Sequence, residues 1–314
     1  MKTNSNSTIN KSTLSSNKAI GIFQYTKDIL KQIRCHQWVK NVFLFIPAFF
    51  AGNLFLGGNI YVLLLGFMAF SLGASTIYII NDLADVEKDR VHPTKKHRPI
   101  ASGSISVMSA RVMAVTTLML CVGLCLFLPY AFGLVVAAYL VMNFCYCFGL
   151  KHVAFLDIII IACGFFLRIL AGGFLVQVPV SSWLMLITFL LALFLAFGKR
   201  RDDVIIFMEE GKKMRKSITG YNLTFIDASL GVLIAVTIVC YIMYTLSPEV
   251  TQRIGSEYIC LTALPVIIGV LRYLQLTFVF QMSGSPTDLV MKDTFLQVVI
   301  GVWLVLFSYF LYLT

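Results

Sequence analysis

Residues 60–90 read IYVLLLGFMAFSLGASTIYIINDLADVEKDR, an apolar run that passes directly into a segment with four acidic residues. An apolar stretch of about 20 residues is long enough to cross a bilayer as a helix. Because neither proline nor glycine lies between Thr76 and Arg90, we expect the helix to continue beyond the apolar layer. The stretch therefore predicts a membrane helix whose end carries carboxylates into the aqueous phase.

The remainder of the chain repeats this apolar pattern. Of its 314 residues, 59% are hydrophobic and 13% are charged, about half the charged share of a soluble domain, which excludes an ordinary soluble globule. The sequence predicts an all-α, polytopic membrane protein with a single domain over residues 21–314 and a disordered cytosolic tail over residues 1–20. Nine expected spans are Val39–Phe55, Ile60–Ile80, Ser109–Leu128, Tyr130–Leu150, Ala154–Leu175, Trp183–Phe197, Ala228–Leu246, Tyr258–Phe280 and Thr294–Leu313.

The distribution of basic residues predicts the orientation. With residue 1 in the cytosol, only Arg253 of the 25 lysines and arginines lies in an outward segment, while Arg168 and Arg272 lie inside spans. An excess of Lys and Arg is typical of cytoplasmic loops, so we expect a cytosolic N-terminus and an outward C-terminus in the cytoplasmic membrane. The same excess explains the net charge of +10 without nucleic acid. Arg168 and Arg272 should face the bundle interior or a wet cavity, or else pair or snorkel.

The acidic segment has the spacing of one helical face. Asn81, Asp85 and Asp89 recur every four residues, and Asp82 precedes Asp85 by three. Mg²⁺ prefers oxygen ligands and is commonly held by one or two carboxylates together with substrate phosphates. We therefore expect a magnesium site for a diphosphate, with a solvated acidic helix end as the alternative.

A basic loop follows the acids. Residues 92–103 read HPTKKHRPIASG, and Pro93 and Pro99 restrict the segment that carries Lys95 and Arg98. Arginine grips phosphate through two parallel hydrogen bonds, and lysine supplies a compact charge. The loop is thus expected to bind phosphate oxygens that the metal does not reach, the alternative being contacts with lipid headgroups.

A second charged segment ends the sixth expected span, where residues 198–203 read GKRRDD. Of its two adjacent aspartates, which point about 100° apart on a helix, we favour Asp203, four residues after Lys199. Asp157, near the inward end of the fifth expected span, could reach the same place. Both charged segments are therefore expected at the cytosolic membrane face, in one site for phosphorylated substrates.

The Asn81-Asp-x-x-Asp85-x-x-x-Asp89 pattern after the second expected span resembles the first aspartate-rich motif of the UbiA prenyltransferase superfamily. That resemblance implies a nine-helix intramembrane bundle around a central cavity open to the cytosol, with Mg²⁺-dependent transfer chemistry. Members that use prenyl diphosphates carry a second motif, roughly Asp-x-x-x-Asp, after the sixth helix. Here Lys199-Arg-Arg-Asp-Asp203 stands in its place, which disfavours transfer to an aromatic acceptor.

Three further segments resemble the decaprenyl-phosphate phosphoribosyltransferase branch of that superfamily: Arg34-Cys-His-Gln-Trp-Val-Lys-Asn41, His92-Pro-Thr-Lys-x-x-Arg-Pro-Ile-Ala-x-Gly103 and Gly198-Lys-Arg200. The resemblance implies a 5-phosphoribosyl 1-diphosphate donor and a polyprenyl phosphate acceptor in the membrane, in an enzyme of cell envelope biosynthesis. The sequence leaves a homo-oligomer open. A cationic site fits these substrates, because they bring several phosphate groups together.

Asp82, Asp85 and Asp89 are the expected catalytic residues, and Asn81, Asp85 and Asp89 are the expected ligands of Mg²⁺. The expected substrate-binding residues are Lys40, Lys95, Arg98, Asp157, Lys199, Arg200, Asp203 and Tyr221.

Two alternatives remain open. A prenyltransferase of the same superfamily would move a prenyl group from its diphosphate to an aromatic or other small acceptor. A transporter of anionic solutes would be expected to carry charges near the bilayer midplane, whereas most charges here lie at helix ends.

Overall fold

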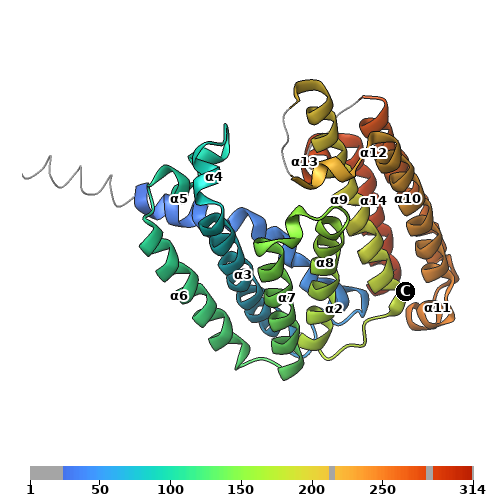
Figure 1. Ribbon diagram of the computed structural model, residues 1–314. Coiled ribbons are helices and arrows are strands. Elements are labelled where there is room, and N and C mark those ends of the chain that lie inside the picture. Colours follow the sequence, from blue (N-terminus) through green and yellow to red (C-terminus); the bar gives the residue numbers. More distant parts are fainter. Residues whose placement is uncertain (1–23, 212–215, 281–285, 313–314) are drawn as a thin grey trace, which may run out of the picture. The chain divides into compact units, whose positions relative to one another are not determined.

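The computed structural model describes residues 24–211, 216–280 and 286–312, and Figure 1 shows their arrangement in helices. Over these residues the chain forms helices and connecting turns without a β-strand. The predicted all-α fold is confirmed. The tail predicted for residues 1–20 lies outside the described residues.

Within the described ranges, eight helical segments are long and apolar enough to cross a membrane, so the chain is a multi-pass membrane protein. Each overlaps an expected span. They are α3 (Asn59–Ala84), α6 (Val107–Cys125), α7 (Tyr130–Phe148), α8 (Leu156–Leu175), α9 (Ser182–Glu210), α10 (Leu223–Leu246), η5 with α12 (Glu257–Thr262 and Ala263–Phe278), and α14 (Thr294–Tyr312). Helix α9 continues past the expected end at Phe197 to Glu210.

The first expected span, Val39–Phe55, has a different structure. A 3₁₀-helix, η1 (Cys35–Phe45), leads into the five-residue helix α2 (Ile46–Phe50). Pro47 lies in the first turn of α2, where its missing N–H costs no hydrogen bond, and Gly52 follows with a φ of 71°. A ninth spanning helix is therefore not confirmed.

Two compact units divide the chain. The first comprises residues 1–41 and 67–127. Its described elements are a helix over residues 24–32, the start of η1, most of α3, the short helices α4 (Val86–Arg90), η2 (Lys95–His97) and α5 (Pro99–Ser102), and α6. Ile79 of α3 packs with Ile100, Ile105 and Ala110, all at most 1% exposed. This core holds the loop between α4 and α6 against the end of α3.

The second unit comprises residues 42–66 and 128–314. Helices α7, α8, α9 and α10 pack in succession, and α12 packs against α10 and α14 (Figure 1). Its short elements are η3 (Leu150–His152), η4 (Lys216–Gly220), α11 (Pro248–Ile254) and α13 (Pro286–Lys292). Phe194, Phe197 and Val204 of α9 form a buried core with Ile226 and Leu230 of α10. This core extends to the charged end of α9.

Close contact of η1 with α8 depends on one glycine. A Cβ atom at Gly172 would lie closer to the backbone oxygen of Leu44 than such atoms approach. The side chains of Phe43 and Phe165 pack edge to face beside it, with ring centroids 4.9 Å apart. Gly172 thus allows the end of η1 to lie directly on α8.

Candidate functional site: two buried clusters of arginine and aspartate

The expected continuous helix is interrupted at Asp85. Helix α3 ends at Ala84, and α4 begins at Val86, with Asp85 at φ −100° and ψ 6°. Helical hydrogen bonds nevertheless persist, since the N–H of Asp85 donates to Asn81 and that of Asp89 donates to Asp85, at 3.0 and 2.8 Å. The break in the helix is therefore confined to Asp85, and the four-residue spacing of Asn81, Asp85 and Asp89 is preserved across it.

Arg98 joins two of the expected catalytic residues. Its Nη1 donates to Oδ1 of Asp82 at 2.9 Å and to Oδ2 of Asp89 at 2.6 Å. Asp82 also accepts from Nη2 of Arg34 at 2.6 Å and from the Gln32 amide at 3.0 Å. Asp82 and Asp89 are both buried. We call these five residues the Arg98 cluster.

Local sequence explains why Arg98 reaches the carboxylates. As the residue before Pro99, it has an extended backbone, with φ −68° and ψ 144°. Gly103 ends the following helical turn in the left-handed conformation that glycine adopts without strain, and the Lys31 ammonium donates to the carbonyl of His97 at 3.0 Å. The loop is therefore fixed on both sides of the guanidinium.

His92 shapes the start of the same loop. Its Nδ1 accepts from the backbone N–H groups of Thr94 and Lys95, each at 3.3 Å. Burial lowers the pKa of His92, and the nearby Lys95 ammonium lowers it further, so Nδ1 remains an acceptor at neutral pH. His92 thus orders the turn that carries Lys95.

The oxygen atoms near α4 fit a partial magnesium site. Asp82 already accepts three charged or amide hydrogen bonds, whereas Asp85 is 20% exposed and lies 3.8 Å from Lys88. Asp89 bonds to Arg98 through Oδ2 alone. Nowhere in the described ranges do three or more His, Cys, Asp or Glu side chains form a group that could hold a metal. The carboxylates in these ranges thus do not form a complete metal site by themselves, and Mg²⁺ commonly takes one or two carboxylates together with substrate phosphates and water.

The second cluster surrounds Arg200 on α9. Its Nε donates to Asp157 of α8 at 2.8 Å, and its Nη1 donates to Asp203 at 2.6 Å. Ser217 of η4 and Tyr221 donate to the same Asp157 carboxylate at 3.0 and 2.7 Å. We call these five residues the Arg200 cluster. It brings together four expected substrate-binding residues: Asp157, Arg200, Asp203 and Tyr221.

Tyr221 also fixes the entry to α8. Its hydroxyl accepts from the N–H of Phe155 at 2.6 Å, and Phe155 has the unusual φ of 72°. Burial raises the pKa of Tyr221, and the hydrogen bond to Asp157 raises it further. The phenol therefore stays protonated and donates to a carboxylate in the first turn of α8, where negative charge is favoured.

The other expected residues differ in burial. Arg200 is 1% exposed, so it holds Asp157 and Asp203 inside the protein. Its neighbour Lys199 is exposed on α9, while Lys40, Lys95 and Asn81 are half-buried. Of the expected set, Lys199 is thus the cation with the most accessible side chain.

Arg168 and Arg272 have distinct environments. Arg168 is buried, donates to the carbonyl of Gly164 and the hydroxyl of Tyr139, and lies over the rings of Tyr139 and Phe165. Arg272 forms an ion pair with Asp293 at 2.8 Å. The first faces the protein interior and the second is paired, two of the outcomes expected from their positions.

The sequence does not single out Gln32 and Arg34 of the Arg98 cluster or Ser217 of the Arg200 cluster. Arg34 was recognised only as part of a motif, and Gln32 and Ser217 carried no signal because polar residues are common at helix ends. Gln32 and Asp82 are separated by 50 positions in the sequence, and Asp157 and Ser217 by 60, so no local periodicity connects them. A search for a basic partner of each buried carboxylate could have found Arg34.

Comparison with known proteins gives the family. The model described as the UbiA prenyltransferase family matches residues 42–278. The decaprenyl-phosphate phosphoribosyltransferase of Corynebacterium glutamicum is 32% identical over 279 residues, covering 88% of this chain and 84% of that protein. The protein of the same name from Mycolicibacterium smegmatis is 31% identical over 286 residues, covering 88% and 90%.

A solved structure agrees on the fold. The UbiA homolog from Archaeoglobus fulgidus bound to DMAPP and Mg²⁺ has a TM-score of 0.64 and 19% sequence identity, covering 91% of this chain and 99% of that one. At this identity the likeness concerns the fold alone. The family model matches most of this chain, and the helices described above agree with it. This chain belongs to the UbiA prenyltransferase family.

Proposed function

We propose that this chain transfers the 5-phosphoribosyl group of 5-phosphoribosyl 1-diphosphate to the phosphate of a polyprenyl phosphate, with release of diphosphate. The observation that carries this proposal is the identity of 31–32% with two decaprenyl-phosphate phosphoribosyltransferases over 88% of this chain. The eight apolar helices are consistent with a substrate that stays in the bilayer.

Asp85 and Asp89 are the proposed metal ligands, together with Asn81. Mg²⁺ bound there would neutralise negative charge on the departing diphosphate. Asp82 has a different role in this proposal, because its two oxygens already accept bonds from Gln32, Arg34 and Arg98. It positions the guanidinium groups.

The guanidinium of Arg98 can bind the carboxylates and a phosphate at the same time. Among the described residues its hydrogen bonds use only Nη1, so Nε and Nη2 remain to donate to a phosphate. Lys95, on the preceding 3₁₀ turn, and Lys40, on η1, are proposed to supply further positive charge. In this proposal Arg98 is held by Asp82 and Asp89 before the substrate binds.

The second cluster is proposed to present Lys199 to a substrate phosphate. Arg200 cannot itself be the exposed donor, because it is buried against Asp157 and Asp203. It would act as a positioning residue that fixes the end of α9, with Tyr221 fixing the start of α8. The acceptor phosphate is already anionic near neutral pH, so orientation matters more than a general base.

A direct assay tests the proposal. The purified protein is incubated with Mg²⁺, decaprenyl phosphate and 5-phosphoribosyl 1-diphosphate labelled in the ribose, and the products are extracted into organic solvent. We expect label in the lipid phase only when decaprenyl phosphate is present. No labelled lipid at saturating Mg²⁺ would reject phosphoribosyl transfer. A parallel reaction with a labelled prenyl diphosphate and an aromatic acceptor tests the competing prenyl transfer.

A further inference from the structure

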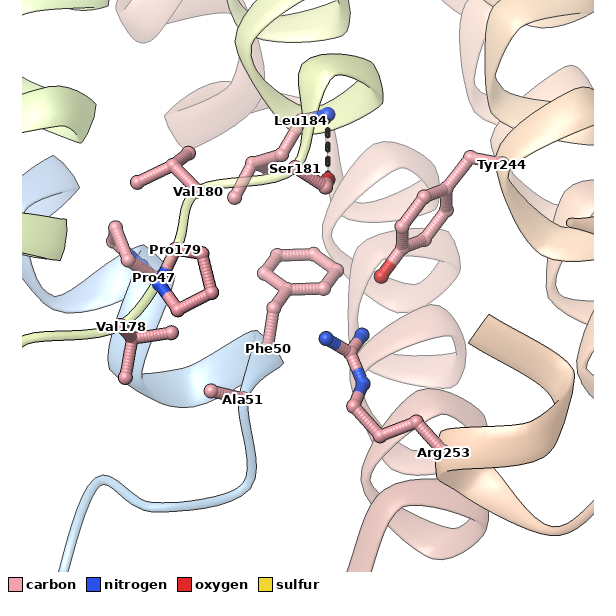
Figure 2. Close-up of a pocket in the computed structure, with 10 residues that line it drawn as sticks. All are labelled: Pro47, Phe50, Ala51, Val178, Pro179, Val180, Ser181, Leu184, Tyr244 and Arg253. Atoms are coloured by element: carbon pink, nitrogen blue, oxygen red, sulfur yellow. Dashed lines mark hydrogen bonds between the residues drawn. The ribbon is translucent and has the colours of Figure 1, made fainter. Parts of the chain in front are cut away.

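A small open pocket in the second unit lies at the N-terminal end of α9. Figure 2 shows the hydroxyl of Tyr244 and the guanidinium of Arg253 pointing toward the same space beside Phe50. Pro179 and Leu184 provide further apolar wall. The pocket therefore combines two hydrogen-bond donors with an apolar lining.

The hydroxyl of Tyr244 has no acceptor for its proton among the described residues. The side chain, on α10, is 3% exposed, and its buried oxygen forms no hydrogen bond of good geometry there, although the Arg253 guanidinium, which can only donate, is close enough to interact with it. A buried polar group left without a partner costs about 1–3 kcal/mol. Occupation of the pocket by an acceptor would remove that cost.

Arg253 makes the pocket positive. It lies in the last turn of α11, and no carboxylate among the described residues forms an ion pair with it, including Glu249 one turn earlier. A guanidinium offers only donors. Water could satisfy Tyr244, but it would not neutralise the arginine, so the preferred occupant is an anion.

The start of α9 adds a third favourable contribution. Ser181 caps this helix, and its Oγ accepts from the N–H of Leu184 at 3.1 Å (Figure 2). The helix continues to Glu210, so its N-terminus carries the partial positive charge of a long dipole. Hydroxyl, guanidinium and helix end all favour negative charge at one place.

The position in the membrane indicates which anion. Along α9, Ser182 and Arg200 are separated by about 27 Å at about 1.5 Å per residue, close to the thickness of the hydrocarbon core. The pocket therefore lies at the membrane boundary opposite the Arg200 cluster. Lipid phosphates are abundant at such a boundary, and arginine binds them through two parallel hydrogen bonds.

We propose that Tyr244, Arg253 and the N-terminus of α9 form a phosphate-binding site, separate from the proposed transferase residues, for a lipid headgroup or free phosphate. The apolar wall formed by Phe50, Pro179 and Leu184 suits the glycerol and upper acyl carbons of an anionic lipid. The site rests on this geometry alone and not on phosphoribosyl transfer.

The test compares binding to the full-length protein in detergent. Dioleoylphosphatidylglycerol is the lipid probe, dioleoylglycerol is the same lipid without phosphate, and inorganic phosphate is the soluble probe at matched ionic strength. Native mass spectrometry counts bound lipid, and thermal unfolding follows inorganic phosphate. The variants are Tyr244→Phe and Arg253→Gln, and Lys292→Gln removes an exposed positive charge elsewhere.

We expect wild type and Lys292→Gln to retain several-fold more phosphatidylglycerol than dioleoylglycerol. Tyr244→Phe and Arg253→Gln should each retain at least five-fold less phosphatidylglycerol than wild type. Without added ligand, Tyr244→Phe should unfold at or above the wild-type temperature, because it removes an unsatisfied hydroxyl. Stabilisation of wild type but not the pocket variants by inorganic phosphate would identify free phosphate instead of the headgroup. If neither probe separates the pocket variants from wild type, there is no such site.

Discussion

Arg200 donates from Nε to the carboxylate of Asp157 at 2.8 Å, with the two side chains 1% and 0% exposed. Removing one partner of such a pair leaves the other charge buried, at a cost of about 3–5 kcal/mol. We therefore expect Arg200→Ala to lower the unfolding temperature of the detergent-solubilised protein strongly. Thermal unfolding followed by tryptophan fluorescence measures this change.

The neighbouring Lys199→Ala is the matched control, because that side chain is exposed and its removal should leave the unfolding temperature nearly unchanged. The double variant Asp157→Asn with Arg200→Gln should lose less stability than the sum of the two single variants. If Arg200→Ala lowered the unfolding temperature no more than Lys199→Ala does, the buried pair would contribute nothing to stability.

Substitution at Asp89 tests the role of the carboxylates on α4. Asp89→Asn and Asp85→Asn should abolish transfer at saturating Mg²⁺, since each removes a proposed metal ligand and keeps the side-chain shape. The labelled-lipid assay measures the effect. Glu87→Gln is the control on the same helix, because Glu87 is 79% exposed and pairs with Arg90 at the surface. Full activity in Asp89→Asn would remove Asp89 from the site.

Asp82→Asn should behave differently from Asp85→Asn. Its carboxylate accepts from Arg34 and Arg98 and is 3% exposed, so the neutral amide would leave Arg34 without its carboxylate partner and Arg98 with Asp89 alone. We expect a lower unfolding temperature as well as a loss of transfer. Unchanged stability would show that Asp82 does not position these arginines.

The positions of most helices follow from the sequence because hydrophobic length is a local property. The eight long helices match expected spans, and the four-residue repeat of Asn81, Asp85 and Asp89 survives the break at Asp85. The ion pairs do not follow from local patterns, since Arg34 and Asp82 are 48 residues apart. The 3₁₀ form of η1 does not follow from local patterns either, because hydropathy does not distinguish a 3₁₀-helix from an α-helix.

Asp293 should give the protein an acid-sensitive element outside its spans. The hydrogen bond from Arg272 lowers the pKa of Asp293 below its ordinary value of 3.8, with a further contribution from the N–H of Leu296. A lowered folded-state pKa means that the stabilisation is present above pH 3.8 and is lost as the pH falls through the folded-state value.

Unfolding temperatures at pH 7 and below pH 3.8 test this expectation. Asp293→Asn should unfold below wild type at pH 7, and the gap should close as the pH falls, because protonation removes the charge from the wild-type side chain. A gap that stays constant over this range would mean that the charge of Asp293 contributes no stability.

Gly172 should tolerate no side chain. The Cβ atom of alanine would clash with the backbone oxygen of Leu44, and backbone cannot move aside as a flexible side chain can. Overpacking of a closely packed interface costs about 1–3 kcal/mol. We therefore expect Gly172→Ala to lower the unfolding temperature by separating η1 from α8.

Gly231→Ala in α10 is the control, because nothing lies within 4 Å of its Cβ position, and alanine favours a helix over glycine by about 0.5–1 kcal/mol. Equal unfolding temperatures for the two variants would show that η1 does not rest on α8 through this contact.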